Sequence, residues 1–446
     1  MDDLIRNSLL QNIHENKWQD IRNQVMKLSV PEIADVFLDI EPDSRLPVLR
    51  LLPEKVSVAV FSYIPSELQK ELIEHLTTDE KRKLLSLMHP DDRTRLFEGM
   101  PDEVTKELLT LLSPEDLQES EELLGYPKES IGRLMTTEYL AVYPDWNIGQ
   151  ALGQIRRYGK LSETVNNMYV IDRHELLLGV ITLTDVILSE PSDPIEKIMI
   201  KDIVTLNPYD DRERASEIMQ EYDITILPVV DSNGVMLGIV TIDDVFDVAV
   251  EETTEDFQKS SAVTPFTTSY RGTSIFQLFH KRIVWLILLV FANLASSGVI
   301  ATFEETLTSY IVLAFFIPLL IDSGGNAGSQ SATLMIRSIA TGDVAISQWF
   351  RTFMKEIGVG LTLGIAMGSA ATVLGLFHGG YQIGLVVGIS MMSIILIANL
   401  IGASLPFIFS RFKMDPAIAS GPLVTTIVDV CGLFFYFTIA RILLRV

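Results

Sequence analysis

The stretch PLVTTIVDVCGLFFYF, residues 422–437, decides the class of fold. It lies in an apolar run of the length that crosses a bilayer, and its only charged group is Asp429. Carboxylates inside membrane helices are costly and by default mark an ion path or a partner. The run holds no basic residue that could neutralise Asp429. This favours an ion path, and the structural alternative is a protonated Asp429 bonded to a neighbouring helix.

Helical spacing around Asp429 supports the first interpretation. Pro422, Thr425, Thr426 and Asp429 are 3, 4 and 7 positions apart, so we expect them on one pore-lining face. Asp415 lies about four turns earlier on a similar face, at the inner mouth.

Four more apolar segments precede this one. The five predicted membrane helices cover about 281–301, 307–337, 353–377, 381–410 and 416–442. With a cytoplasmic N-terminus, the basic flanks fall inside, whereas the loops around 304–305 and 378–382 carry no basic residue.

The second segment, FFIPLLIDSGGNAGSQSATLMIRSIATGD (residues 315–343), interrupts its apolar run with Pro318, Asp322 and Asn326. Two interpretations remain open. The small residues form a packing seam, or the segment lines a pore or acts as a hinge, since unwound backbone is tolerated where it lines a cavity. The glycines at 360, 364 and 368 of the third segment are typical of helix packing.

The charge is divided unevenly along the chain. Of the net charge of −23, residues 271–446 contribute +3 and residues 1–270 contribute −26. An acidic surface of this kind repels nucleic acid and attracts cations. The single Cys431 excludes an internal disulfide and a Cys-based zinc site. The start, MDDLIRNSLL, lacks the basic and apolar regions of a signal peptide, so we expect a cytoplasmic soluble region.

Residues 28–112 contain a repeat. Apolar residues recur every twelve positions, at Leu28, Ile40, Leu52, Ile64, Leu76, Met88, Met100 and Leu112. Each is followed by Pro, Ser or Thr and then an acid, which is the signature of a helix start. The pattern predicts a superhelical stack of short helices. The acids at the helix starts are explained first as partners of the helix dipoles.

A second duplication covers about 130–255. GVITLTD at 179–185 is matched by GIVTIDD at 238–244, and each copy predicts strand, helix, strand, turn, strand and helix. This pattern is similar to paired CBS domains. In the nucleotide-binding members a hydroxyl contacts phosphate and an Asp binds ribose, which would be Thr182 with Asp185 and Thr241 with Asp244. An empty scaffold is the alternative.

The helix predicted after the second copy is acidic on one face. Asp244, Asp247, Glu251 and Glu255 stand at offsets 0, 3, 7 and 11. Like charges at these spacings destabilise a helix unless a cation lies between them. The alternative is a solvated face.

Together these patterns resemble the MgtE family of bacterial magnesium channels. The most specific segments are GGNAGSQSATLMIRSIATGD (324–343), MDPAIASGPLVTTIVDVCG (414–432) and VTIDDVFDVAVEETTEDF (240–257). The resemblance implies a multi-domain chain: an all-α superhelical N domain (1–129), an α/β CBS pair (130–190 and 191–243), a connecting plug helix (244–270) and a five-helix membrane domain (271–446). It also implies a homodimer in the cell membrane, with Mg²⁺ as substrate and regulator.

The resemblance assigns residues one by one. The pore acid is Asp429 and the inner-mouth acid is Asp415, with Thr425, Pro422 and Asn326 lining the path. The remaining implied metal ligands are Asp91, Asp92, Glu213, Asp223, Asp244, Asp247, Glu252, Glu255 and Asp256. The family often has an acid where this chain has Arg95, which questions the N-domain site. ATP binding at the CBS pair is implied for some members.

We therefore expect a Mg²⁺ influx channel that cytosolic Mg²⁺ closes by bridging the N domain, CBS pair and plug helix. The closest rival is an ion-coupled secondary transporter of divalent cations such as Mg²⁺, Co²⁺ or Mn²⁺. An enzyme is not expected. An intramembrane aspartyl protease with an Asp322–Asp429 dyad lacks the Gly-x-Gly-Asp pattern and leaves the acidic region unexplained.

Overall fold

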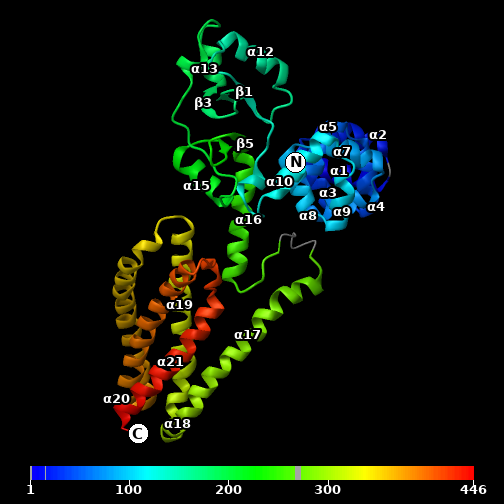
Figure 1. Cartoon of the computed structure of the whole chain (residues 1–446). Helices are drawn as coiled ribbons and strands as arrows, with labels where there is room; N and C mark the ends of the chain where they lie inside the picture. Colours follow the sequence, from blue (N-terminus) through cyan, green and yellow to red (C-terminus); the bar gives the residue numbers. More distant parts are fainter. Residues whose placement is uncertain (1–2, 16, 267–272, 446) are drawn as a thin grey trace. The chain divides into compact units, whose positions relative to one another are not determined.

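The computed structural model describes residues 3–15, 17–266 and 273–445, which fall into two compact units (Figure 1). The first unit ends at residue 251 and the second begins at residue 252. The helix α16 (Ile242–Ser260) contributes residues to both.

The first unit begins with a stack of helices. These are α1 (Asp3–His14), α2 (Trp18–Val25), α3 (Val30–Asp39), α4 (Pro42–Leu51), α5 (Glu54–Tyr63), α6 (Ser66–His75), α7 (Thr78–Leu87), α8 (Pro90–Gly99), α9 (Asp102–Leu109) and α10 (Pro114–Gly125).

The twelve-residue repeat is confirmed by this stack. Helices α3 to α8 have ten residues each, and each ends at a residue with extended backbone. Those end residues are six of the eight repeated apolar positions, Ile40, Leu52, Ile64, Leu76, Met88 and Met100. One cap residue and one N-cap between consecutive ten-residue helices give the period of twelve.

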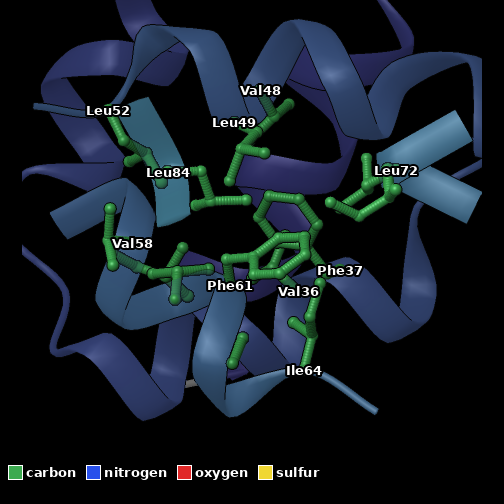
Figure 2. Packing of buried hydrophobic residues seen from close by; sticks show 14 of the residues in the cluster. Val36, Phe37, Val48, Leu49, Leu52, Val58, Phe61, Ile64, Leu72 and Leu84 are labelled. Carbon is green, nitrogen blue, oxygen red and sulfur yellow. The ribbon is translucent and has the colours of Figure 1, made fainter. Parts of the chain in front are cut away.

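Short helices bury their apolar faces against one another. Phe37 and Phe61 are fully buried, and Leu49, Leu72 and Leu84 surround them (Figure 2). The burial of such faces, more than helix propensity, stabilises helices of this length.

The CBS region follows in the same unit. Its elements are α11 (Ile131–Leu134), β1 (Leu140–Val142), α12 (Ile148–Tyr158), β2 (Asn167–Ile171), β3 (Leu177–Thr182), α13 (Leu183–Leu188), α14 (Ile195–Ile198), α15 (Glu213–Tyr222), β4 (Ile226–Val230), β5 (Met236–Thr241) and α16.

The first copy follows the predicted order, and the second differs by one strand. In the first, β1 pairs parallel to β2 and β2 antiparallel to β3, with Tyr169 opposite Val180. In the second, β4 pairs with β5 alone, and the expected first strand is reduced to a single bridge between Leu206 and Val229. Pro208 follows Leu206 closely and has no N–H to donate, so the pairing cannot extend.

The second unit is built mainly of long apolar helices. Its elements after α16 are α17 (Ile275–Thr302), α18 (Glu304–Ser309), η1 (Ile311–Phe316), α19 (Ile317–Ala340), η2 (Ile346–Gln348), α20 (Trp349–Arg411), η3 (Pro416–Ile418) and α21 (Gly421–Leu444). Within the residues that the structure describes, four helical stretches are long and apolar enough to cross a membrane.

One of those stretches, α20, contains a reversal of the chain. Gly380 has φ 73° and ψ −168°, a backbone conformation that only glycine adopts readily. The two arms pack closely, because a Cβ added to Gly364 or Gly375 would lie 2.9 Å or 2.6 Å from backbone atoms of the other arm. The five-span arrangement remains a prediction.

The second predicted span is a continuous α-helix from Ile317, with the six-residue 3₁₀ helix η1 before it. Of the two interpretations left open for 322–331, the continuous helix supports the packing seam, and a pore-lining role remains a prediction. A Cβ on Gly324 would lie 2.5 Å from Ile394, and one on Gly402 would lie 2.1 Å from the carbonyl oxygen of Gly328. Small residues here let α19 approach α20 closely.

The plug helix predicted over 244–270 corresponds to α16, which begins two residues earlier and ends at Ser260. Part of the predicted range, residues 267–270, lies outside the described residues.

Candidate ion path and acidic clusters

The carboxylate of Asp429 lies in α21, half-buried, in the second unit. Its Oδ1 is buried and makes no hydrogen bond to any described residue. Asp322, on α19, lies close enough for its negative charge to repel that of Asp429. Neither carboxylate forms an ion pair within the described residues, so two uncompensated acids lie near each other in an apolar bundle.

The polar residues of α19 continue this arrangement. Asp322 and Asn326 are exposed, and the Asn326 amide donates to Asp322 Oδ2 at 3.4 Å. The hydroxyls of Ser329 and Thr425 lie 3.2 Å apart and join α19 to α21. Among the predicted path residues, Asn326, Thr425 and Asp429 are thus contributed by two helices in contact.

The predicted common face of α21 is only partly present. Thr425 and Asp429 are partly exposed, and Pro422 occupies the first turn of the helix. Thr426, in contrast, is buried and its hydroxyl donates to the carbonyl oxygen of Pro422. Thr426 therefore faces the interior of the bundle.

Asp415 precedes α21 and contacts the end of α16. Its Oδ1 accepts from the N–H of Ala417 at 2.8 Å and caps η3. Lys259 Nζ lies 2.5 Å from Asp415 Oδ2 and also forms an ion pair with Glu255. Burial alone would lower the pKa of Lys259, but hydrogen bonds to both carboxylates raise it overall. Lys259 is therefore a fixed cation between two acids.

Asp256 belongs to the same group. Burial, followed by repulsion from Asp415, raises the pKa of Asp256 to about 6. The charges of Glu252 and Glu255 act in the same direction, whereas Lys259 opposes it. Acids predicted from the sequence, Glu252, Glu255, Asp256 and Asp415, therefore gather around one lysine.

A second cluster lies in the first unit, around Arg95 of α8. Its guanidinium donates to Asp247 Oδ2 at 3.1 Å and lies 3.5 Å from Asp244 Oδ1. The residue that departs from the family pattern is therefore a cation placed between two of the predicted metal ligands.

Asp91 completes this cluster. Its Oδ1 is buried without a hydrogen-bond partner among the described residues. Burial, followed by repulsion from Asp244 and Asp92, raises the pKa of Asp91 well above its usual value. Burial also raises the pKa of Asp244 to about 6, although Arg95 opposes the shift. The structure thus brings Asp91, Asp92 and Asp244 together, with more acidic groups than one arginine neutralises.

The other two predicted ligands in the CBS region, Glu213 and Asp223, lie at opposite ends of α15. Glu213 is its first residue, and Asp223 ends the helix with a left-handed backbone (φ 59°) and an exposed side chain. On α16, the predicted acidic face includes Glu251, which pairs with Arg212 at 3.2 Å.

The tightest group of potential ligands was not predicted from the sequence. In the described part of the chain, His89, Glu138 and Glu163 form the one set of three such side chains whose ligand atoms lie within 4.8 Å of one another. His89 Nδ1 is 2.5 Å from Glu138 and 3.1 Å from Glu163. The hydrogen bond to Glu138 raises the pKa of His89 to about 9. These residues join α8 to the CBS region, and their separation in sequence gave no signal.

The hydroxyl and acid pairs proposed for nucleotide contact are bonded to each other. Thr182 Oγ1 donates to Asp185 at 2.6 Å, and Thr241 Oγ1 donates to Asp244 at 2.9 Å. In the first copy this closes a capping box at the start of α13. A local structural role therefore explains these residues without a ligand.

The chain thus combines a helical stack, a CBS pair and apolar helices whose carboxylates Asp322 and Asp429 form no ion pair with a described residue. This combination defines a multi-domain membrane protein. Residues 317–439 match the family model of the divalent cation transporter MgtE, and residues 28–129 match that of the MgtE intracellular N domain. Residues 131–190 and 195–251 match the CBS domain. The chain belongs to the MgtE family.

Two curated relatives match all or nearly all of the chain. The magnesium transporter MgtE of Thermus thermophilus is 36% identical over 100% of both chains. That of Bacillus subtilis is 29% identical over 96% of this chain and 95% of the relative. Among solved structures, the cytosolic domain of the Mg²⁺ channel MgtE in complex with ATP matches with a TM-score of 0.53 and 31% identity, covering 55% of this chain and 99% of that one.

Proposed function

We propose that this chain forms a Mg²⁺ channel that admits the ion and is closed by cytosolic Mg²⁺ bound to its acidic clusters. The observation that carries the proposal is the carboxylate of Asp429, whose buried Oδ1 has no hydrogen-bond partner among the described residues and which lies near Asp322 inside apolar helices. Buried charges without a partner are costly, and a passing cation supplies the missing partner.

The chemistry of Asp429 suits a hydrated divalent ion. Mg²⁺ prefers six oxygen ligands and gives up its waters reluctantly, so one or two carboxylates with retained water bind it well. In the proposed homodimer two Asp429 side chains face each other on the axis, with Asn326 and Thr425 as polar neighbours. The repulsion between the two acids falls when a divalent cation enters.

Closure depends on the acids of the soluble region and α16. Asp91, Asp92 and Asp244 repel one another, as do Asp256 and Asp415. A divalent cation that binds these groups when they are close together stabilises that arrangement, which we assign to the closed state. An ion that binds one state better shifts the population toward it. Glu213 and Asp223 belong to this regulatory set only by resemblance to the family.

The test is a current measurement on the purified chain in lipid bilayers. A channel conducts Mg²⁺ at a fixed voltage without a proton or sodium gradient, and millimolar Mg²⁺ on the side of the soluble region reduces the current. The rival transporter requires a coupling gradient for flux. Flux that stops when the gradient is removed would overturn the channel proposal.

ATP binding at the CBS pair is a second, separate proposal. It rests on the MgtE cytosolic domain, 31% identical, which was solved in complex with ATP. Because Thr182 and Asp185 already bond each other, ATP must replace part of a capping box. Calorimetric titration with ATP, comparing the wild type with Thr182→Val, tests it, and equal affinities would exclude Thr182 as a ligand.

A further inference from the structure

A groove in the second unit lies outside the ion path. It has a volume of about 250 Å³ and is lined by Ile346, Trp349, Phe353, Ala403, Ser404, Phe407, Ile408 and Arg411. These residues come from η2 and from the two arms of α20, near the end where both arms terminate. The groove is therefore largely apolar, with one cation at its rim.

Two polar side chains of the groove, Arg411 and Ser404, have no polar partner among the described residues. Arg411, the last residue of α20, is exposed and forms no ion pair within the described residues. The Ser404 hydroxyl likewise makes no hydrogen bond to a described residue. The guanidinium of Arg411 and the hydroxyl of Ser404 can thus donate hydrogen bonds to the oxygens of an anion.

The position of the groove matches the surface of a bilayer. Trp349 is exposed and Arg411 lies at a helix end, and both residue types collect where a membrane meets water. Arg351, Lys355 and Lys413 are also exposed at this end. Basic grooves between membrane helices at this depth are suited to anionic lipid head groups.

We infer that this groove binds an anionic phospholipid of the surrounding bilayer, with the phosphate at Arg411 and an acyl chain along Phe353 and Ile408. Charge complementarity favours an anionic lipid over a zwitterionic one. The head group of an anionic lipid carries a net negative charge, which all the basic residues at this end of the helices attract. The occupant is also amphiphilic, as the groove is.

The residues that line the groove also contact α19, the helix that carries Asp322 and Asn326 of the proposed ion path. Phe407 and Ala403, which line it, pack on Met335 of α19. The neighbouring Gly402 is in tight contact with Gly328 of the same helix. A bound lipid therefore stabilises the α19–α20 contact, and its loss loosens that contact.

Thermal unfolding of the purified full chain in detergent tests the inference. Dioleoylphosphatidylglycerol and dioleoylphosphatidylcholine are titrated in turn, and the rise of the unfolding midpoint gives an apparent affinity. We expect phosphatidylglycerol to stabilise the wild type more strongly. Arg411→Gln, which removes a charge-assisted hydrogen bond, should weaken its apparent affinity about tenfold.

Arg351→Gln is the matched control, because Arg351 is an exposed arginine at the same end but outside the groove. It should retain the selective stabilisation. Equal loss in both variants would reduce the effect to general surface charge and overturn the site, as would equal stabilisation by the two lipids. Ile408→Cys adds a further check, since efficient cross-linking between copies would assign the groove to a second copy of the chain.

Discussion

The acidic groups of this protein differ in whether a basic side chain lies beside them. In the first unit Asp244 and Asp247 share the fixed cation Arg95, and near the end of α16 Glu255 and Asp415 share Lys259. The membrane carboxylates Asp322 and Asp429 have no such cation within the described residues. A fixed cation offsets part of the repulsion at all times, whereas an acid without one depends on a mobile ion for all of it. This difference separates the proposed regulatory clusters from the proposed ion path.

The largest effect is expected from Asp429. Asp429→Asn or Asp429→Ala removes the charge that concentrates cations in the path, so Mg²⁺ uptake should fall about 10- to 1000-fold. Uptake in a magnesium-requiring strain measures it, with Glu304→Gln, an exposed acid of α18, as the control. Wild-type uptake in both Asp429 variants would contradict the role of Asp429.

Removing the cation beside Asp415 should change closure strongly. Lys259→Met leaves Glu255, Asp256 and Asp415 uncompensated, so the arrangement that brings them together becomes more dependent on Mg²⁺. We expect the Mg²⁺ concentration for half-closure to change about tenfold, within the usual range of allosteric coupling. Patch recordings measure it, and Lys259→Arg should behave as the wild type. An unchanged half-closing concentration in Lys259→Met would remove Lys259 from gating.

A smaller and more local effect is expected at Arg95. Arg95→Gln frees Asp244 and Asp247 beside Asp91 and Asp92, which should create a tighter divalent site. Calorimetric titration of the full chain with Mg²⁺ should show an affinity gain of about fivefold, the lower end of measured coupling. Arg95→Lys, which retains the charge, is the control. If Arg95→Gln binds Mg²⁺ no better than the wild type, the acids around Arg95 are structural.

The smallest expected effect is a pH dependence from His89. Its folded-state pKa of about 9 lies above the ordinary value of 6.5. The stability contributed by the ion pairs with Glu138 and Glu163 is therefore complete below pH 6.5 and lost as pH rises through 9. Thermal unfolding of the wild type and His89→Gln should converge above pH 9 and differ below pH 6.5. A constant difference across this range would show that the charge of His89 is irrelevant.

The sequence predicted regular features better than contacts between distant residues. The twelve-residue period located the ends of α3 to α8 because each period is one helix plus two extended residues. The acids of α16 followed from helical spacing alone. The pairing of Lys259 with Asp415, 156 positions apart, depends on tertiary structure and has no local pattern.

Errors arose where a residue type permits two structures. The small residues of 322–331 permitted either a packing seam or unwound backbone, and the segment is a continuous helix in which Gly325 and Gly328 accommodate Thr425 and Val424. Thr426 was assigned to the path by spacing, but its hydroxyl bonds Pro422 inside the bundle. Neither choice can be made until the neighbouring helix is known.

The reversal at Gly380 bears on how the chain enters a membrane. A Cβ at this position would meet no neighbouring atom within 4 Å, so the requirement for glycine comes from the backbone angles alone. The arms on either side are tightly fitted to each other along Gly364, Gly368, Gly384 and Gly388. The two arms can therefore associate as a helical hairpin before the other helices pack against them. The pairing of the two arms as a hairpin thus depends on the one glycine at which the chain reverses.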